Sequence, residues 1–487
     1  MRPAFLIYRK SGLPYSGGFE QLLRQEKTLY EIGEERSDLP VTCFEGVFPD
    51  WAYDYVKDGG IAFVSGAGGN TFSFDSGFKC RANVEHVDLS DLGQGKTRIC
   101  SMICVFAGAG KGEVTLHENR SIKDGLRPGF YPVFLYKKLG KGTIIYTGVD
   151  FSSLLTCEGD DLRNTSDVLD FDERISSIDK AGVSAALRNI LKEAMNMAGL
   201  PYLSLAYYPD GARNVFAYSI DGDGLLTKGV EDLIAVSKKT DTKFVFYINW
   251  QLCHDDPDIY NKLKKIEENN IVASHGYIHN GKDGYDENKK DLEKFDAWMK
   301  DLGVEYVKSY AAPRGMYCAD LGKALKDMGY RHSRDFGFAV DDHPYFPYRE
   351  GVQEAPLQIP CDGFNVCRWM LKNKEQSLPM PSAEEILTAY IRLIDRKLEL
   401  DRPLLFFCHP QYFGLYAAAV YPKMVDYVKS KGVMLTDYVS YGDFWIRRDA
   451  CSYDAKWEDG KLDIVKDDWS DDVVLYIDGA DEYEYQR

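Results

Sequence analysis

Two of the eight histidines in the chain lie four residues apart, directly after a short apolar run. His275 and His279 follow Ile271-Val-Ala-Ser, which is typical of a buried strand. A spacing of four residues places both imidazoles on one face of a helical turn, where they can bind a single metal ion. A pair of core or solvent-exposed histidines is the alternative, and we favour metal ligands.

Polar residues also follow other apolar runs in this part of the chain. Asp221 and Asp223 end the run that begins at Val215, and they project from the same side if the backbone stays extended. An Asp-Gly turn explains this pair when it is taken alone. Three further sets are Arg314 in a Pro-Arg-Gly loop, the Arg334–Asp335 pair, and His409 after an apolar strand. We interpret these residues together as one site.

Apolar runs alternate with helical stretches from residue 214 to about residue 450. Repeated strand–helix units of this length predict a barrel of parallel strands. In such barrels, active sites gather at the carboxyl ends of the strands. The polar residues at those ends are therefore expected to meet.

Residues 205–450 resemble the polysaccharide deacetylase family, carbohydrate esterase family 4, in five motifs and in their order. The matching segments are Ser219-Ile-Asp-Gly-Asp-Gly224, His275-Gly-Tyr-Ile-His279, Ala311-Ala-Pro-Arg-Gly315, Asp335 and Phe406-Phe-Cys-His409. The resemblance implies a distorted (β/α) barrel.

The resemblance also implies roles for the site residues. Asp221 is implied to be the base, His409 the acid, and Asp335 the group that orients His409. The implied ligands of a divalent metal, which we expect to be zinc, are Asp223, His275 and His279. Such an ion lowers the pKa of its water and polarises the scissile carbonyl.

The third motif departs from the family pattern. Ala311 stands in place of the arginine that steadies the base in the family, and Arg314 stands where a tyrosine is usual. The backbone N–H of Arg314 is still expected to bind the oxyanion, because this role does not depend on the side chain. Arg314 or Arg334 could replace the missing arginine beside Asp221, although a surface ion pair explains either arginine as well.

The first third of the chain also alternates strands and helices. We predict strands at 41–45 and 61–65, a helix at 51–57, and a hairpin at 131–148. This order resembles the flavodoxin-like, class I glutamine-amidotransferase-like fold over residues 1–170. Cys43 is followed by Phe-Glu-Gly and lacks the setting of a catalytic cysteine, so we expect it to be structural.

The predicted fold class is therefore α/β, with three parts. Residues 1–200 are predicted to form a non-catalytic amidotransferase-like domain that ends in a boundary helix at 187–197. Residues 201–450 are predicted to form the deacetylase-like (β/α) barrel. Residues 451–487 are predicted to form a short, acidic β extension.

Composition narrows the partners and the location. Acidic residues outnumber basic residues by 76 to 59, a net charge of −17, which argues against a nucleic-acid or anionic-membrane surface. No apolar run reaches the ~20 residues of a membrane-spanning helix, and the first residues are charged too soon for a signal peptide. The 11 cysteines lack paired spacing, so reduced thiols and a cytoplasmic location are expected.

We predict a metal-dependent hydrolase of carbon–nitrogen bonds other than peptide bonds, which removes the acetyl group from an N-acetylated carbohydrate. Two alternatives stay open. The altered third motif is compatible with a catalytically inactive carbohydrate-binding or scaffold protein. The same centre could also hydrolyse a non-sugar amide, because the loops of a barrel set its specificity.

Overall fold

The computed structural model describes residues 1–12, 16–66, 78–106, 108–116, 129–156, 178–223, 225, 228–281, 284–335, 342–349, 352–479 and 485–486. Contacts divide the chain into two compact units. The first comprises the described residues of 1–157, 177–206 and 448–487, and the second comprises those of 207–447. The strands after residue 450 therefore group with the first unit.

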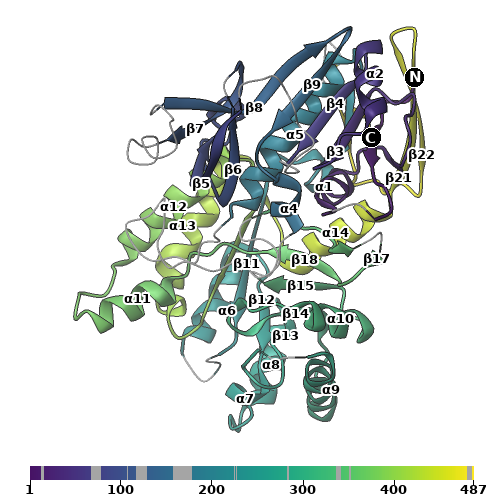
Figure 1. The fold of residues 1–487 in the computed structure, drawn as a ribbon. Helices are drawn as coiled ribbons and strands as arrows, with labels where there is room; N and C mark the ends of the chain where they lie inside the picture. The colour runs from purple at the N-terminus through teal and green to yellow at the C-terminus, as the bar shows by residue number, and fades with distance from the viewer. Residues whose placement is uncertain are drawn as a thin grey trace. The chain divides into compact units, whose positions relative to one another are not determined.

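The described strands of the first unit include nine that form one mixed sheet in the order β2-β1-β3-β4-β9-β8-β7-β5-β6 (Figure 1). The pairings from β2 to β9 are parallel and the remaining pairings are antiparallel. The strands are β1 (Phe5–Tyr8), β2 (Tyr30–Gly33), β3 (Val41–Glu45), β4 (Ile61–Ser65), β5 (Phe78–Asp88), β6 (Lys96–Phe106), β7 (Gly110–Leu116), β8 (Gly129–Leu139) and β9 (Gly142–Thr147).

Helices pack on both faces of the parallel half of this sheet. Phe63 and Val64 are neighbours in β4, and they enter two different apolar clusters because successive strand side chains point to opposite faces. The helices are α1 (Gly18–Glu26), α2 (Asp50–Asp58), α4 (Phe151–Thr156) and α5 (Lys180–Met197). This layering confirms the predicted α/β class, whereas the amidotransferase-like resemblance stays a prediction. The boundary helix begins at Lys180 rather than Leu187.

Cys43 in β3 is fully buried, and burial raises the pKa of its thiol. A reactive cysteine needs an exposed thiolate of lowered pKa. The structure therefore favours a packing role for Cys43, as the sequence predicted.

The first unit also contains two small antiparallel sheets. One is formed by β10 (Tyr202–Leu205), β23 (Leu475–Asp478) and β24 (Tyr485–Gln486). The other is the hairpin of β21 (Ser452–Glu458) and β22 (Lys461–Asp467).

Parallel strands form the centre of the second unit, in the order β18-β15-β14-β13-β12-β11-β19, with β20 paired to β11. After β18, the backbone N–H of Asp362 donates to the carbonyl of Leu405 in β19 at 2.9 Å, which links the two ends of the sheet. The predicted distorted barrel is thus confirmed. The strands are β11 (Val215–Asp221), β12 (Val245–Ile248), β13 (Ile271–Ser274), β14 (Val307–Ala311), β15 (His332–Asp335), β18 (Leu357–Pro360), β19 (Leu404–Cys408) and β20 (Met434–Leu435).

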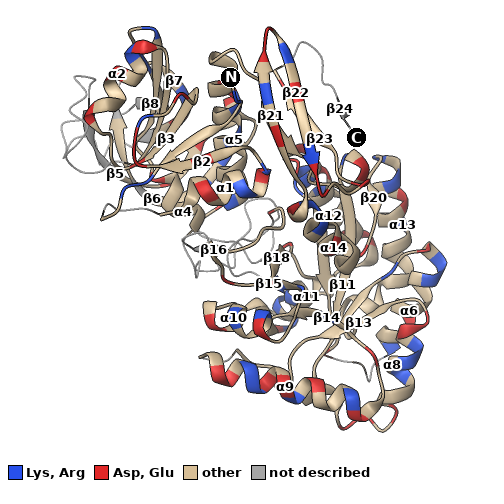
Figure 2. Ribbon diagram, turned by 90° about the vertical axis from the view of Figure 1, so that its right-hand side faces the viewer, with Lys and Arg blue, Asp and Glu red and all other residues tan. Residues whose placement is uncertain are grey.

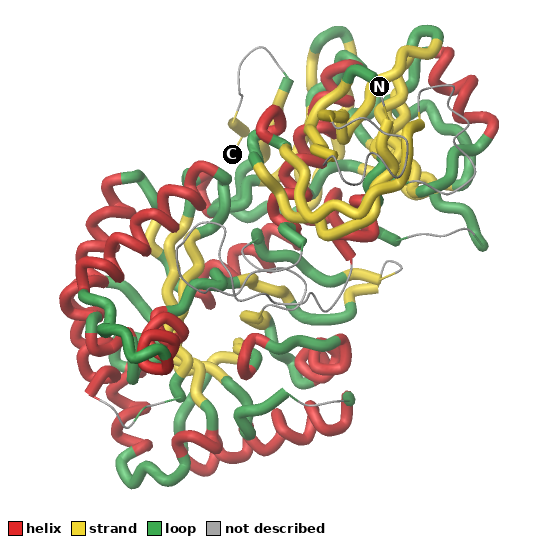
Figure 3. Tube along the Cα trace, turned by 60° about the vertical axis from the view of Figure 1, so that its left-hand side comes forward, coloured by secondary structure: helices red, strands yellow, loops and turns green. Residues whose placement is uncertain are grey.

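Helices surround these strands in the second unit, as the red and yellow segments of Figure 3 show. On α9, Leu292, Phe295 and Met299 are buried, while most exposed positions of the helix are Lys, Asp or Glu, which are coloured on the ribbon of Figure 2. This division is typical of a helix that packs one face on a core. The helices are α6 (Lys228–Thr240), α7 (Trp250–Cys253), α8 (Ile259–Glu267), α9 (Tyr285–Leu302), α10 (Ala319–Asp327), α11 (Val366–Glu375), α12 (Ala383–Glu399), α13 (Ala417–Ser430) and α14 (Tyr438–Ala450).

Shorter elements complete the two units. The 3-10 helices are η1 (Ser90–Leu92), η2 (Pro209–Gly211), η3 (Pro313–Gly315) and η4 (Phe413–Leu415), and a two-stranded sheet pairs β16 (Tyr348–Arg349) with β17 (Val352–Gln353). β18 and α11 were not predicted from the sequence. Residues of α11 and of the segment between β18 and α11 line the candidate site.

Candidate metal and catalytic site

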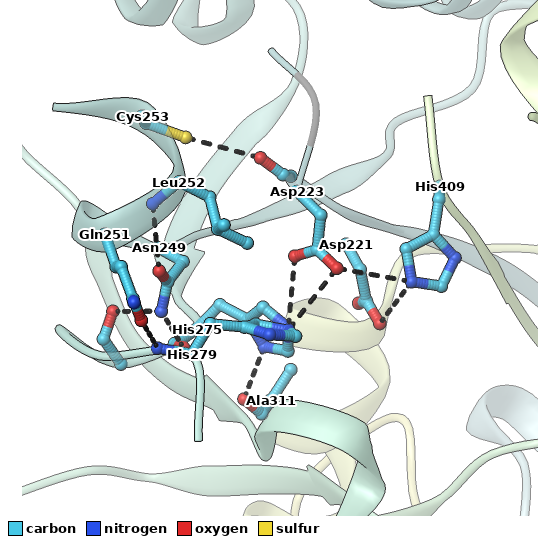
Figure 4. A network of polar contacts seen from close by, with 12 residues as sticks. Asp221, Asp223, Asn249, Gln251, Leu252, Cys253, His275, His279, Ala311 and His409 are labelled. Atoms are coloured by element: carbon cyan, nitrogen blue, oxygen red, sulfur yellow. Dashed lines mark hydrogen bonds and ion pairs between the residues drawn. The ribbon is translucent and has the colours of Figure 1, made fainter. Parts of the chain in front are cut away.

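The carboxyl ends of the barrel strands bring the predicted residues together (Figure 4). Asp221 is the last residue of β11, and Asp223 follows two residues later. His275 directly follows β13, and His409 directly follows β19. Parallel strands end at the same edge of a sheet, which is why residues up to 188 positions apart in the sequence meet here.

Asp223 lies between the two histidines that we predicted as metal ligands. Its Oδ1 atom is 3.5 Å from Nε2 of His275, and its Oδ2 atom is 3.3 Å from Nε2 of His279. One ligand atom from each residue lies within 4.8 Å of the others. Two imidazoles and one carboxylate at this separation are a suitable donor set for a divalent transition metal.

Hydrogen bonding fixes the orientation of His275. Its Nδ1 atom lies 2.7 Å from the carbonyl oxygen of Ala311 at the end of β14. A carbonyl accepts only, so Nδ1 carries the proton and Nε2 keeps the lone pair that a ligand needs. Burial lowers the pKa of His275, and the same cause lowers the pKa of His279 and His409. The neutral form that binds metal is therefore favoured.

The segment between the two ligand histidines is not helical, so the predicted helical turn is wrong. Gly276 has a φ of +79°, which lies outside the right-handed helical region. Asp291 of α9 stabilises this loop by accepting from the backbone N–H groups of Tyr277 at 2.8 Å and Ile278 at 3.1 Å. The imidazoles converge because of this bend rather than because of helical spacing, and their ring centroids are 5.0 Å apart.

Two buried acceptor atoms that face each other indicate that a cation fits the site. Within the part of the chain that the structure describes, Oδ1 of Asp223 and Nε2 of His275 are buried without a hydrogen-bond partner. Neither can donate to the other, because the proton of His275 is on Nδ1. Burial raises the pKa of Asp223, and the charge of Asp221 adds to this increase while His409 opposes it. A divalent cation between these atoms would satisfy both, so the residues fit such a metal.

Asp221 forms a buried ion pair with Arg334 of β15. The guanidinium of Arg334 lies between two rings, 5.1 Å from the centroid of Tyr247 and 4.8 Å from that of Phe407. Burial alone would raise the pKa of Asp221, but the guanidinium of Arg334 beside it, with smaller contributions from His275 and His409, outweighs burial and lowers the pKa. Asp221 is therefore ionised and able to accept a proton.

His409 approaches both aspartates from the opposite strand, β19. Its Nε2 atom is 3.9 Å from Oδ2 of Asp221 and 3.5 Å from Oδ2 of Asp223. Its Nδ1 atom lies 3.2 Å from Nδ2 of Asn365, the N-cap residue of α11. Because Oδ1 of Asn365 accepts from the backbone N–H of Cys367, its amide nitrogen donates to Nδ1, and the proton of the neutral imidazole is on Nε2.

Asp335 and Arg314 line the same cavity as these residues. Asp335 accepts from the hydroxyl of Ser333, whereas the contact at Nδ1 of His409 comes from Asn365. Arg314 is the central residue of η3 and has a left-handed backbone with a φ of +60°. Its charge contributes to the lowered pKa of His279, behind the larger effect of burial.

A cavity of about 440 Å³ contains the site. This volume is that of a pocket for a small organic ligand. Besides the residues already described, its wall includes Ala312, Gly315, Cys361, Gly363, Cys367, Arg368, Leu371, Lys372, Glu375, Gln376 and Phe407. Most of these come from the segment of β18 and α11 that the sequence analysis did not identify.

Comparison with known proteins gives a family match for the segment that carries Asp221, Asp223 and both ligand histidines. A family model described as "Polysaccharide deacetylase" matches residues 211–333. Residues 211–333, about a quarter of the chain, are thus similar to the polysaccharide deacetylase family. The resemblance seen in the motifs is thereby confirmed for this segment, and the hydrolase class that we predicted is the class of this family.

The solved structures that match cover about half of this chain. A proposed polysaccharide deacetylase from Mycobacterium smegmatis has 17% identity and a TM-score of 0.42, over 49% of this chain and 91% of that protein. A family 4 carbohydrate esterase from Streptomyces lividans, in complex with acetate, has 14% identity and a TM-score of 0.31, over 46% and 92%. A CE4 family pseudoenzyme from Bacillus anthracis has 16% identity and a TM-score of 0.33, over 48% and 66%. No curated protein matches the sequence.

Among the described helices, none combines the length and the apolarity that a membrane span needs.

The chain departs at position 311 from the family pattern, in which the resemblance places an arginine. Position 311 is an alanine, and its carbonyl instead holds His275. The guanidinium beside Asp221 belongs to Arg334, on the next strand of the barrel. Of the two arginines that we considered as replacements, the structure therefore places Arg334 at this position.

Asn365 is a residue of the candidate site that was not predicted from the sequence. It lies 44 positions before His409 and outside the five motifs. An Asn directly before a helical stretch is a common N-cap, so this signal could have indicated the start of α11. Nothing in the sequence indicates that the same amide also reaches a histidine.

Proposed function

We propose that the second unit is a metal-dependent deacetylase that removes the acetyl group from an N-acetylated carbohydrate. One observation carries this proposal: Asp223, His275 and His279 form a metal-type donor set, and an ionised carboxylate and an imidazole lie beside it in the same cavity. The alternatives are an inactive carbohydrate-binding protein and a hydrolase of a non-sugar amide.

The proposed ligands are Asp223, His275 and His279, and the expected ion is zinc. When bound, a divalent metal supplies a water of lowered pKa and a positive charge that polarises the acetyl carbonyl. Asp221 accepts the proton of the attacking water, and Arg334 holds this carboxylate in place. His409 presents its Nε2 proton toward the same space and is proposed to protonate the leaving nitrogen. The backbone N–H of Arg314 is proposed to bind the oxyanion.

Metal content and acetate release test this function together. We expect about one divalent ion per chain by elemental analysis and release of acetate from N-acetylated oligosaccharides. Chelation should abolish the release and re-addition of zinc should restore it. A bound metal without turnover on any acylated compound would instead favour the binding protein, and turnover limited to non-sugar amides would favour the third function.

Asn365→Ser should slow catalysis without destabilising α11. Serine is as good an N-cap as asparagine, so the bond to the backbone N–H of Cys367 can be kept. The donor to Nδ1 of His409 is lost, and we expect kcat to fall about tenfold, which is less than the about 10²–10⁴-fold that an acid–base group itself contributes. The measurement is steady-state kinetics alongside thermal unfolding.

Asp335→Asn is the matched comparison for this variant. The role of Asp335 in orienting His409 stays a prediction. If Asp335→Asn lowers kcat while Asn365→Ser leaves it unchanged, Asp335 rather than Asn365 orients the acid. The reverse result supports the assignment made from the geometry.

Asp291→Ala should weaken metal binding although Asp291 is not one of the proposed ligands. Its carboxylate fixes the loop between His275 and His279 through two backbone N–H groups. Loss of a group that orients metal ligands typically costs about 10–100-fold in affinity. Titration of the metal-free protein with zinc measures the change, and Asp301→Ala, an exposed position on the same helix, is the control. Equal affinity in both variants would contradict this role.

A further inference from the structure

Three polar side chains lie inside the barrel, next to the ion pair of Asp221 and Arg334. They are Tyr247 of β12, Ser309 of β14 and His332 of β15, and all three are fully buried. The interior of such barrels is usually filled with branched apolar side chains. A buried polar group costs free energy unless it is hydrogen-bonded, so the partners of these residues decide whether they fit there.

The strand positions of these side chains point them to the barrel interior. On β12, Phe246 enters the apolar cluster shared with α6 and α13, so its neighbour Tyr247 faces the other side of the sheet. On β15, His332 is two residues before Arg334 and shares its face. Ser309 is the register partner of His332 on β14. The three side chains therefore lie on the same side of the sheet as the guanidinium.

A continuous chain of polar contacts links the three residues to the surface. The hydroxyl oxygen of Tyr247 is 3.0 Å from Oγ of Ser309, which is 2.8 Å from Nδ1 of His332. Nε2 of His332 is 3.5 Å from Oδ1 of Asp443 on α14, and Arg331 holds this carboxylate at 2.8 and 3.2 Å. Burial opposes the ionisation of Asp443, but His332 and Arg331 outweigh it and lower its pKa.

This carboxylate sets the direction of the whole chain. Because a carboxylate accepts only, the proton of the neutral imidazole is on Nε2 of His332, and Nδ1 accepts from Ser309. Ser309 in turn accepts from Tyr247, which keeps its proton because burial raises its pKa, although the charge of Arg334 opposes this. Helix α14 also packs on the ring of His332, since a Cβ at Gly442 would lie 2.7 Å from its Cδ2. The imidazole and both hydroxyls are thus held in one orientation.

The ring of Tyr247 supports the guanidinium that holds the base. The guanidinium carbon of Arg334 is 5.1 Å from the centroid of this ring and 4.8 Å from that of Phe407. Arg334 pairs with Asp221, and its Nη1 atom is 3.9 Å from Sγ of Cys361. The two rings therefore help to fix the guanidinium, and of the two only Tyr247 has a hydroxyl that anchors its ring.

We propose that Tyr247, Ser309 and His332 are positioning residues for the base of the reaction. Their chain holds the ring of Tyr247 against Arg334, and Arg334 in turn holds the carboxylate of Asp221 where it can accept the proton. This inference rests on the proposed deacetylase function and adds residues to it that are not part of the cavity wall. A misplacement of about 1 Å can cost about 10²-fold in rate, so loss of the chain should reduce turnover rather than substrate binding.

Tyr247→Phe keeps the ring and removes only its hydroxyl. We expect kcat per bound metal ion to fall about tenfold, while KM stays within about twofold of the wild-type value. His332→Leu, at the other end of the chain, should have the same effect. His332→Asn should restore most of kcat, because its Oδ1 atom can accept from Ser309 near the position of Nδ1. The double variant Tyr247→Phe/His332→Leu should be no slower than the slower single variant, because both changes remove the same chain.

Tyr390→Phe is the matched control for this set. It also removes a fully buried tyrosine hydroxyl, which is 2.6 Å from that of Tyr218, but Tyr390 packs in the cluster between the helices and the strands. Tyr247→Phe and Tyr390→Phe should each lower the midpoint temperature of unfolding by about 2–4 °C, whereas only Tyr247→Phe should lower kcat. If kcat per bound metal is the same in Tyr247→Phe, His332→Leu and Tyr390→Phe, the chain is only structural and the inference is wrong.

A readout without substrate separates failure of the inference from failure of the function. The protein is labelled with isotopic arginine for NMR, and the side-chain signals of Arg334 are identified by their loss in Arg334→Met. We expect separate Nη–H signals in the wild type, because a paired guanidinium between two rings rotates slowly, and broadened signals in Tyr247→Phe. If no acylated sugar releases acetate but this broadening is seen, the chain does position Arg334 and the deacetylase function is wrong. Unchanged signals in Tyr247→Phe and in His332→Leu would count against the inference.

Discussion

His275→Ala should lose its bound metal and its activity while its fold survives. The Nε2 atom of His275 is one of three donors, and its removal leaves Asp223 and His279. Loss of an outer partner of a metal ligand already costs about 10–100-fold in affinity, so loss of a ligand itself should cost more. A catalytic metal lowers the activation barrier by several kcal/mol. We therefore expect kcat/KM to fall about 10³-fold or more when the metal is lost.

Elemental analysis, acetate release and circular dichroism measure these three properties. The control is His254→Ala, because His254 lies on the surface near the site and is absent from the cavity wall. This control should keep its metal and its activity. Full metal occupancy in His275→Ala would count decisively against the ligand assignment.

Arg334→Met should damage both stability and catalysis. Arg334 and Asp221 are 3% and 6% exposed, so removal of the guanidinium leaves a buried carboxylate without its partner. Breaking a buried ion pair in this way typically costs about 3–5 kcal/mol of unfolding free energy. We expect kcat/KM to fall about 10²-fold as well, because Asp221 loses the group that holds it in place.

A double variant separates the ion pair from general packing. Asp221→Asn in the Arg334→Met background removes the unpaired charge, so part of the lost stability should return while activity stays low. Arg334→Lys keeps the charge but loses the two-pronged geometry of the guanidinium. Its stability and its kcat/KM should therefore lie between those of the wild type and Arg334→Met. Urea unfolding and steady-state kinetics give the two readouts. If the double variant is no more stable than Arg334→Met, the ion pair does not explain the effect.

The barrel and the cluster of polar residues at its strand ends could be predicted from the sequence because their signals are local. Each strand is a short apolar run, and the residue that matters is the one where the run stops, as with Asp221 and His409. Because the carboxyl ends of parallel strands lie at the same edge of a sheet, these residues can be placed together from the sequence alone. The spacing of His275 and His279 indicated two imidazoles that do converge in the structure, but for a wrong local reason, since Gly276 bends the chain.

The partners of the catalytic groups could not be predicted in the same way. Which arginine pairs with Asp221 depends on which strand places a guanidinium close enough to its carboxylate. From the sequence, Arg314 and Arg334 were equal choices. Asn365 reaches His409 only because β18 precedes α11 at the barrel edge, and β18 is too short for a clear pattern. Such contacts depend on three-dimensional distances that periodicity does not encode.

Asp223, His275 and His279 are proposed to bind one divalent metal. The decisive experiment is anomalous diffraction at the zinc absorption edge from crystals of the zinc-loaded protein. We expect a single strong peak at about 2.0–2.2 Å from one carboxylate oxygen and from Nε2 of both histidines. A map with no peak there, and with the three side chains turned away from each other, would contradict it.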